Sequence, residues 1–110
     1  MGNHDSAMQV TRDNLAQAID EALARTQTAA AAFRANPGSP LTAHYIDLAL
    51  STLQDIKAQL SVPPSQRIPR PSRFDAAFVY DDPEFDESLA SLIIKIEDVY
   101  RRWHREIYAR

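Results

Sequence analysis

The sequence PEFDESLASLIIKIEDVYRRWHREIYA, residues 83–109, decides the fold because its apolar side chains recur at helical spacing. They follow one another in alternating steps of four and three, with a final step of four: Phe85, Leu89, Leu92, Ile96, Val99, Trp103 and Ile107. Ile93 and Tyr100 widen this line into a broad stripe. A helix with such a stripe must bury it against other helices, so the segment predicts an all-α fold.

The charges of this segment also fit a helix over about 83–109. Asp82 is suited to the N-cap and Pro83 to the first helical position. Acidic residues follow in the first turns (Glu84, Asp86 and Glu87), and arginines gather at the other end (Arg101, Arg102, Arg105 and Arg110). Acid at the start and base at the end complement the helix dipole.

Two more helices are predicted upstream, over about 11–35 and about 40–60. The buried face of the first is expected to contain Leu15, Ile19, Ala22, Thr26, Ala29 and Phe33, and that of the second Leu41, Tyr45, Leu48, Thr52, Ile56 and Leu60. Thr11 or Asp13 can cap the first helix, and Ser39 followed by Pro40 can start the second. Between them, Pro37 breaks the helix and Gly38 can take a positive φ. A connection this short predicts antiparallel neighbours and, with the last helix, an antiparallel bundle of three principal helices.

The chain between the second and last helices is expected to be an extended crossover. Residues 61–73 contain four prolines, which forbid a helix and stiffen the chain. A stiff connector is the simpler interpretation, and a partner-docking segment is the alternative. The aromatic residues of 74–80 are expected to form a short helix or irregular segment that plugs one end of the bundle. We expect residues 1–110 to form a single domain with residues 1–10 flexible.

Composition limits the possible functions. The chain has 110 residues, a net charge of −3 and no cysteine, and its pI is near 5.5. Disulfides and thiolate metal sites are therefore excluded, and a general nucleic-acid binder is disfavoured because such proteins carry excess basic charge. No apolar run is long enough to span a bilayer, so we expect a cytoplasmic protein. The abundance of alanine and of arginine over lysine is typical of a GC-rich bacterial genome.

No motif indicates catalysis. His4, His44 and His104 lie far apart and lack the spacing of metal ligands, and we expect His44 and His104 at polar helix rims. We therefore predict no catalytic residue, no cofactor and no metal site, and a protein that is not an enzyme.

Two charged groups are candidate partner-binding residues. The basic group at the end of the last helix comprises Arg101, Arg102, Arg105 and Tyr108, and the acidic group before it comprises Asp81, Asp82, Glu84, Asp86 and Glu87. Tyr and Arg are common interface anchors, and acidic surfaces attract basic partners. Helix capping is the simpler explanation of the acids.

These features favour a non-enzymatic protein–protein interaction module, such as a small bacterial adaptor, a secretion chaperone or an immunity-type inhibitor. Wide apolar faces predict a homodimer or a complex with another helical protein. One alternative is a small helical enzyme or ligand-binding bundle, which would need buried polar groups converging on a cavity. The other is a nucleic-acid-associated factor that uses the basic end of the last helix.

Overall fold

The computed structural model describes residues 11–68, 74 and 82–109, with the backbone alone for Pro64 and residues 105–109. Three long helices dominate it: α1 (Arg12–Ala35), α2 (Pro40–Gln59) and α4 (Glu87–Ala109). A single 3-10 turn, η1 (Pro64–Gln66), follows α2. The described residues contain no strand, so the predicted all-α class is confirmed.

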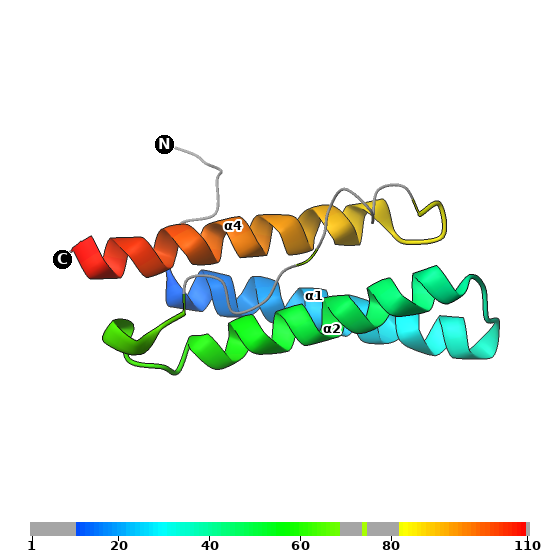
Figure 1. Ribbon diagram of the computed structural model, residues 1–110, viewed down its shortest axis with the longest axis horizontal. Helices are drawn as coiled ribbons and strands as arrows, with labels where there is room; N and C mark the ends of the chain where they lie inside the picture. Colours follow the sequence, from blue (N-terminus) through cyan, green and yellow to red (C-terminus); the bar gives the residue numbers. More distant parts are fainter. Residues whose placement is uncertain (1–10, 69–73, 75–81, 110) are drawn as a thin grey trace.

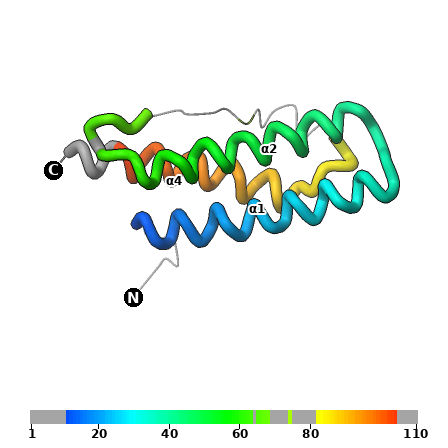
Figure 2. The backbone as a smooth tube through the Cα atoms, turned by 90° about the horizontal axis from the view of Figure 1, so that it is seen from below, coloured from blue at the N-terminus to red at the C-terminus, as the bar shows by residue number. Residues whose placement is uncertain are grey.

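The helices lie side by side, and α1 runs antiparallel to both of the others (Figure 1). Consequently α2 and α4 begin at the same end of the bundle and run parallel to each other (Figure 1). Seen from below, α4 lies behind the gap between α1 and α2 (Figure 2). We call the end that contains the α1–α2 connection and the start of α4 the connection end.

The start signals of α1 and α2 are confirmed. The Thr11 hydroxyl accepts a hydrogen bond from Asn14 N–H at 3.2 Å, and the Ser39 hydroxyl accepts one from Leu41 N–H at 3.1 Å. Pro40 occupies the start of α2, where a missing N–H has no cost. Gly38 does not use the positive φ that glycine can take, because its φ lies outside that region.

The last helix begins at Glu87 rather than at 83, and Asp86 rather than Asp82 caps it. The Asp86 carboxylate accepts hydrogen bonds from Ser88 N–H at 2.9 Å and Leu89 N–H at 3.3 Å. Asp82 instead starts a turn, in which its carbonyl accepts a bond from Phe85 N–H at 3.3 Å. Both aspartates are good caps by residue type, and contacts with α1 and α2 decide between them.

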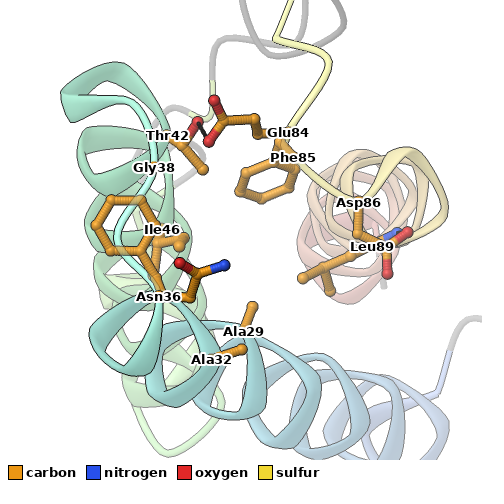
Figure 3. A pocket seen from close by; sticks show the side chains of 11 residues that line it. Ala29, Ala32, Asn36, Gly38, Thr42, Ile46, Glu84, Phe85, Asp86 and Leu89 are labelled. Carbon is orange, nitrogen blue, oxygen red and sulfur yellow. Dashed lines mark hydrogen bonds between the residues drawn. The ribbon is translucent and has the colours of Figure 1, made fainter.

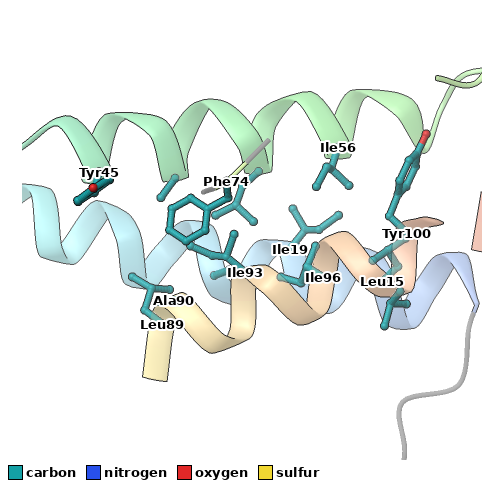
Figure 4. Packing of buried hydrophobic residues seen from close by; sticks show 14 of the residues in the cluster. Leu15, Ile19, Tyr45, Ile56, Phe74, Leu89, Ala90, Ile93, Ile96 and Tyr100 are labelled. Atoms are coloured by element: carbon teal, nitrogen blue, oxygen red, sulfur yellow. The ribbon is translucent and has the colours of Figure 1, made fainter. Parts of the chain in front are cut away.

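The core lies along the facing sides of the three helices (Figure 4). Most of the predicted stripe of α4 is buried, with Leu89, Ile96 and Val99 at most 1% exposed. The centre of the buried stripe is shifted slightly from the predicted line of residues, because Ile93 is fully buried whereas Leu92 is only partly buried. Two predicted positions are wrong. Leu41, which was expected on the buried face of α2, is 50% exposed. His104, which was expected at a polar helix rim, is buried, and its ring stacks on that of Tyr100.

Phe74 reaches into the space between α2 and α4 (Figure 4). Its side chain is buried, its N–H donates to Glu97 Oε2 at 3.1 Å, and its ring lies 6.0 Å from that of Phe85. This site lies between helices, whereas the prediction had placed an aromatic plug at one end. The rest of the aromatic segment and residues 1–10 fall outside the described part of the chain.

The start of the connector is docked on α4. The Arg67 guanidinium lies 4.0 Å from the centroid of the Trp103 ring, and Arg67 Nε donates to the Val62 carbonyl at 2.9 Å. Tyr100 donates its hydroxyl proton to the Ile68 carbonyl at 2.6 Å. The expectation that prolines exclude helix fails at η1, because proline is tolerated in a first turn.

No helix within the described ranges is long and apolar enough to cross a membrane. Among described side chains, only Leu41 and Ile68 are large, hydrophobic and exposed. Little of the described surface is therefore available for apolar contact with a second copy. The homodimer stays a prediction.

Replacing Trp103 with alanine should destabilise the fold strongly. The side chain is 4% exposed and contacts both Tyr100 and Arg67. Its loss should lower the free energy of unfolding by about 3–5 kcal/mol, as expected for a buried aromatic residue. Urea denaturation followed by circular dichroism measures this change. A loss below about 1 kcal/mol would contradict the core position, since that is the scale of surface substitutions.

Candidate functional site

The described residues surround a pocket of about 410 Å³ at the connection end of the bundle (Figure 3). Its volume lies in the range of about 300–1,000 Å³ that is typical of ligand sites. Most of its wall is apolar, and two carboxylates stand in its lining. The lining residues are Ala29, Ala32, Phe33, Asn36, Gly38, Thr42, Ile46, Glu84, Phe85, Asp86 and Leu89.

Three separate segments build this pocket. The last two turns of α1 and the connection to α2 form one wall, the first turns of α2 form another, and residues 84–89 close the third side (Figure 3). Ala29 and Ala32 leave space because their side chains end at Cβ. Phe85 is held opposite them by an edge-to-face contact with Tyr45, at 6.5 Å between ring centroids.

A group of hydrogen bonds joins the segment before α4 to the start of α2, and we call it the Thr42 clamp. Thr42 donates to Asp82 Oδ2 at 2.8 Å, and its hydroxyl also lies 3.3 Å from Glu84 Oε1. Ser39 N–H donates to the same Glu84 oxygen at 3.0 Å. Asp82 Oδ1 accepts from Glu84 N–H at 3.0 Å. Thr42 and Asp82 are both buried, so these bonds fix the position of Glu84.

Gly38 is required for this position of Glu84. A Cβ atom added at residue 38 would collide with the Glu84 carboxylate. The absence of a side chain, rather than an unusual backbone angle, is therefore what this glycine contributes. The colliding atoms belong to the end of a flexible side chain, so a substitution would displace Glu84 rather than the backbone.

Asp86 links α4 to α1 as well as capping α4. Arg25 Nη2 lies 3.1 Å from Asp86 Oδ2 and donates to Ser88 Oγ at 2.7 Å. Partial burial opposes ionisation of Asp86, but hydrogen bonds from Leu89 N–H, Arg25 and Ser88 N–H and the charge of Arg25 outweigh it. The pKa of Asp86 is consequently lowered.

The structure brings part of the predicted acidic group together and gives its members different roles. Asp82 is buried in the Thr42 clamp, Glu84 stands in the pocket wall, and Asp86 caps α4. Glu87 is exposed in the first turn of α4. Asp81 lies outside the described residues. Some members of the acidic group thus join segments of the fold, and others give the pocket wall a negative charge.

The predicted basic group lies far from the pocket. Arg101 and Asp86 are separated by about 22 Å along the helix axis at 1.5 Å per residue. Arg101 and Arg102 both pair with Asp98, at 3.5 Å and 3.2 Å. The side chains of Arg105 and Tyr108 lie outside the described part of the structure. The two predicted groups therefore do not form one site.

Sequence reasoning missed the apolar half of the pocket. Ala32 gave no signal because an alanine within an Ala-rich helix is explained by helix propensity alone. Phe33 and Ala29 were assigned to the core, and both are only partly buried. Two sequence features together could have indicated the site: the abrupt end of the helix after Ala35 and the run of acidic residues before α4.

The pocket lining offers an apolar surface and a negatively charged side chain. Within the described ranges, no three His, Asp or Glu side chains are grouped so that they could hold a metal ion. The apolar wall can receive a hydrophobic group, and the Glu84 carboxylate can accept a hydrogen bond or a cation. No protein family, curated protein or solved structure matches the chain.

Gly38→Ala should displace Glu84 with little effect on stability. The Glu84 carboxylate would lose its bonds to Ser39 and Thr42, while the new alanine reduces the entropy of the unfolded chain. The free energy of unfolding should change by less than about 1 kcal/mol. The amide resonance of Ser39 should shift in a ¹H–¹⁵N spectrum, as it should in Glu84→Ala. An unchanged Ser39 resonance in both variants would contradict this contact.

Asp86→Asn should remove a pH-dependent contribution to stability. Asparagine also caps helices, so the variant loses mainly the pairing with Arg25 and should be less stable at pH 7 by about 0.2–1 kcal/mol. Because the pKa of Asp86 is lowered on folding, this contribution is present above the ordinary Asp pKa of about 3.9 and is lost as pH falls through the lowered value. Urea denaturation at pH 7, 4 and 2 tests this expectation. A difference between the two proteins that grows toward pH 2 would contradict it.

Proposed function

We propose that the protein is a non-enzymatic interaction module that holds a protein partner at the pocket of the connection end. A small adaptor, a secretion chaperone and an immunity-type inhibitor all belong to this class. The observation that carries the proposal is an apolar pocket bounded by three chain segments, with a positioned carboxylate in its wall. Binding hot spots commonly consist of an anchor side chain that fills such a pocket.

The positions of the surrounding residues support the same function. The pocket wall is held by the Thr42 clamp and by the Arg25–Asp86 pair, so little ordering is required when a partner binds. Preorganisation of this kind favours affinity because less conformational freedom is lost. The Ala32 side of the pocket is exposed, which leaves a path for an entering side chain.

A small-molecule binding bundle is the second candidate, and the pocket volume favours it. About 410 Å³ could hold a compact ligand without any partner protein. The nucleic-acid alternative has less support. Arg101 and Arg102 share one acidic neighbour, Asp98, which offsets part of the charge that phosphate binding would need.

Filling the pocket should abolish partner capture. Ala32→Trp places a large side chain in the pocket wall, whereas Ala31→Trp adds the same side chain to the same helix outside the pocket lining. The tagged wild-type protein and both variants would be used for crosslinked capture from cells that naturally express the chain. The proposal expects one partner to be retained by the wild type and by Ala31→Trp and lost by Ala32→Trp.

Thermal melting should first show that both variants fold. Equal retention of the partner by all three proteins would overturn the assignment of the pocket. Failure of every protein to retain a partner, together with binding of small metabolites by the wild type alone, would favour the second candidate.

A further inference from the structure

We propose that the pocket receives one bulky apolar side chain of a partner polypeptide, and that Glu84 pairs with a lysine or arginine next to that side chain. This inference rests on the proposed function and adds the chemistry of the partner. Three observations carry it: the charge balance of the pocket, the fixed position of Glu84 and the apolar opposite wall.

The charge balance of the pocket favours a cation. Among the described residues that line it, Glu84 and Asp86 alone are charged, and both are acidic. Asp86 is paired with Arg25 and accepts two backbone hydrogen bonds, so its charge is largely compensated. No described basic side chain forms an ion pair with Glu84. The uncompensated charge at the pocket is therefore that of Glu84.

The Glu84 carboxylate is held with one oxygen available. Oε1 accepts from Ser39 N–H and lies near the Thr42 hydroxyl. Oε2 receives no hydrogen bond from the residues that the structure describes. A cationic donor can therefore bind Oε2 without displacing the bonds that position the side chain. Charge-assisted hydrogen bonds of this kind are stronger than neutral ones.

The opposite wall provides the apolar part of the contact. Ala29, Ala32 and Ile46 face Phe85 and Leu89 across the pocket (Figure 3). An aromatic or long aliphatic side chain could lie against this wall while an adjacent basic residue reaches Glu84. A free metal ion or a purely polar ligand would leave the apolar wall unused.

Peptide selection tests this chemistry directly. Random seven-residue peptides displayed on phage would be selected on the wild-type protein after depletion on Ala32→Trp. The inference expects enrichment of Phe, Trp, Leu or Ile beside Lys or Arg. The affinity of a synthetic copy would be measured by calorimetry for the wild type, Glu84→Gln and Glu87→Gln.

Glu84→Gln keeps a side-chain oxygen for Ser39 N–H but removes the charge. Its affinity for the peptide should fall about tenfold, which corresponds to about 1.4 kcal/mol. Glu87→Gln removes the same charge from an exposed residue outside the pocket lining and should stay within about twofold of the wild type, as expected for a screened surface charge. Added salt should weaken binding to the wild type more than binding to Glu84→Gln.

The possible failures are distinguishable. Selected peptides without basic residues, or equal affinity of the wild type and Glu84→Gln, would overturn this inference and leave the pocket as a partner site. Failure to select any peptide that depends on Ala32 would also overturn it. The proposed function would then be judged by the capture experiment. Insertion of the same segment from a second copy would appear as a dimer that Ala32→Trp abolishes.

Discussion

The hydrogen bond from the Thr42 hydroxyl to the buried Asp82 carboxylate holds the connection end of the bundle together. The helices α2 and α4 start at the same end and run parallel (Figure 1), and this bond attaches the segment before α4 to the first turn of α2. The second carboxylate oxygen of Asp82 accepts the Glu84 N–H. A buried carboxylate without such partners would be costly, so the contact fixes the register of the approach to α4. The contact thereby anchors the turn from Asp82 to Phe85, whose backbone bonds to Asp82 place Glu84 and Phe85.

The same geometry explains why a pocket exists in so small a protein. The middle of the bundle is closed by large side chains, with Ile19, Leu53 and Ile93 fully buried and Phe74 between α2 and α4 (Figure 4). At the connection end, alanines on α1 face the non-helical segment just before α4, and the small alanine side chains do not fill the space between them. The alanines of the lining thus come from α1, whereas both carboxylates come from the segment at the start of α4. A pocket with both properties suits a partner that offers an apolar group beside a positive charge.

The sequence predicted the helices well because local signals agreed with the burial pattern. The Thr11 and Ser39 caps and the apolar stripe of α4 are all visible from residue type and spacing. The start of α4 was misplaced because Asp82 and Asp86 are equally good caps by residue type. Only long-range contacts distinguish them, that of Asp82 with Thr42 and that of Asp86 with Arg25. The pocket was not predicted because it depends on how segments far apart in sequence approach one another. The acidic residues were singled out by their density, which did not reveal that one is buried, one caps a helix and one faces a cavity.

A double-mutant cycle at Thr42 and Asp82 tests this constraint most directly. The free energy of unfolding would be measured in urea for the wild type, Thr42→Val, Asp82→Ala and the double variant. If the contact fixes the connection end, the two substitutions should be coupled by about 1–2 kcal/mol, because each leaves the same buried bond unmade. If the effects of the two single substitutions add to within about 0.3 kcal/mol, the two side chains act independently. That result would contradict the claim that their contact fixes the connection end.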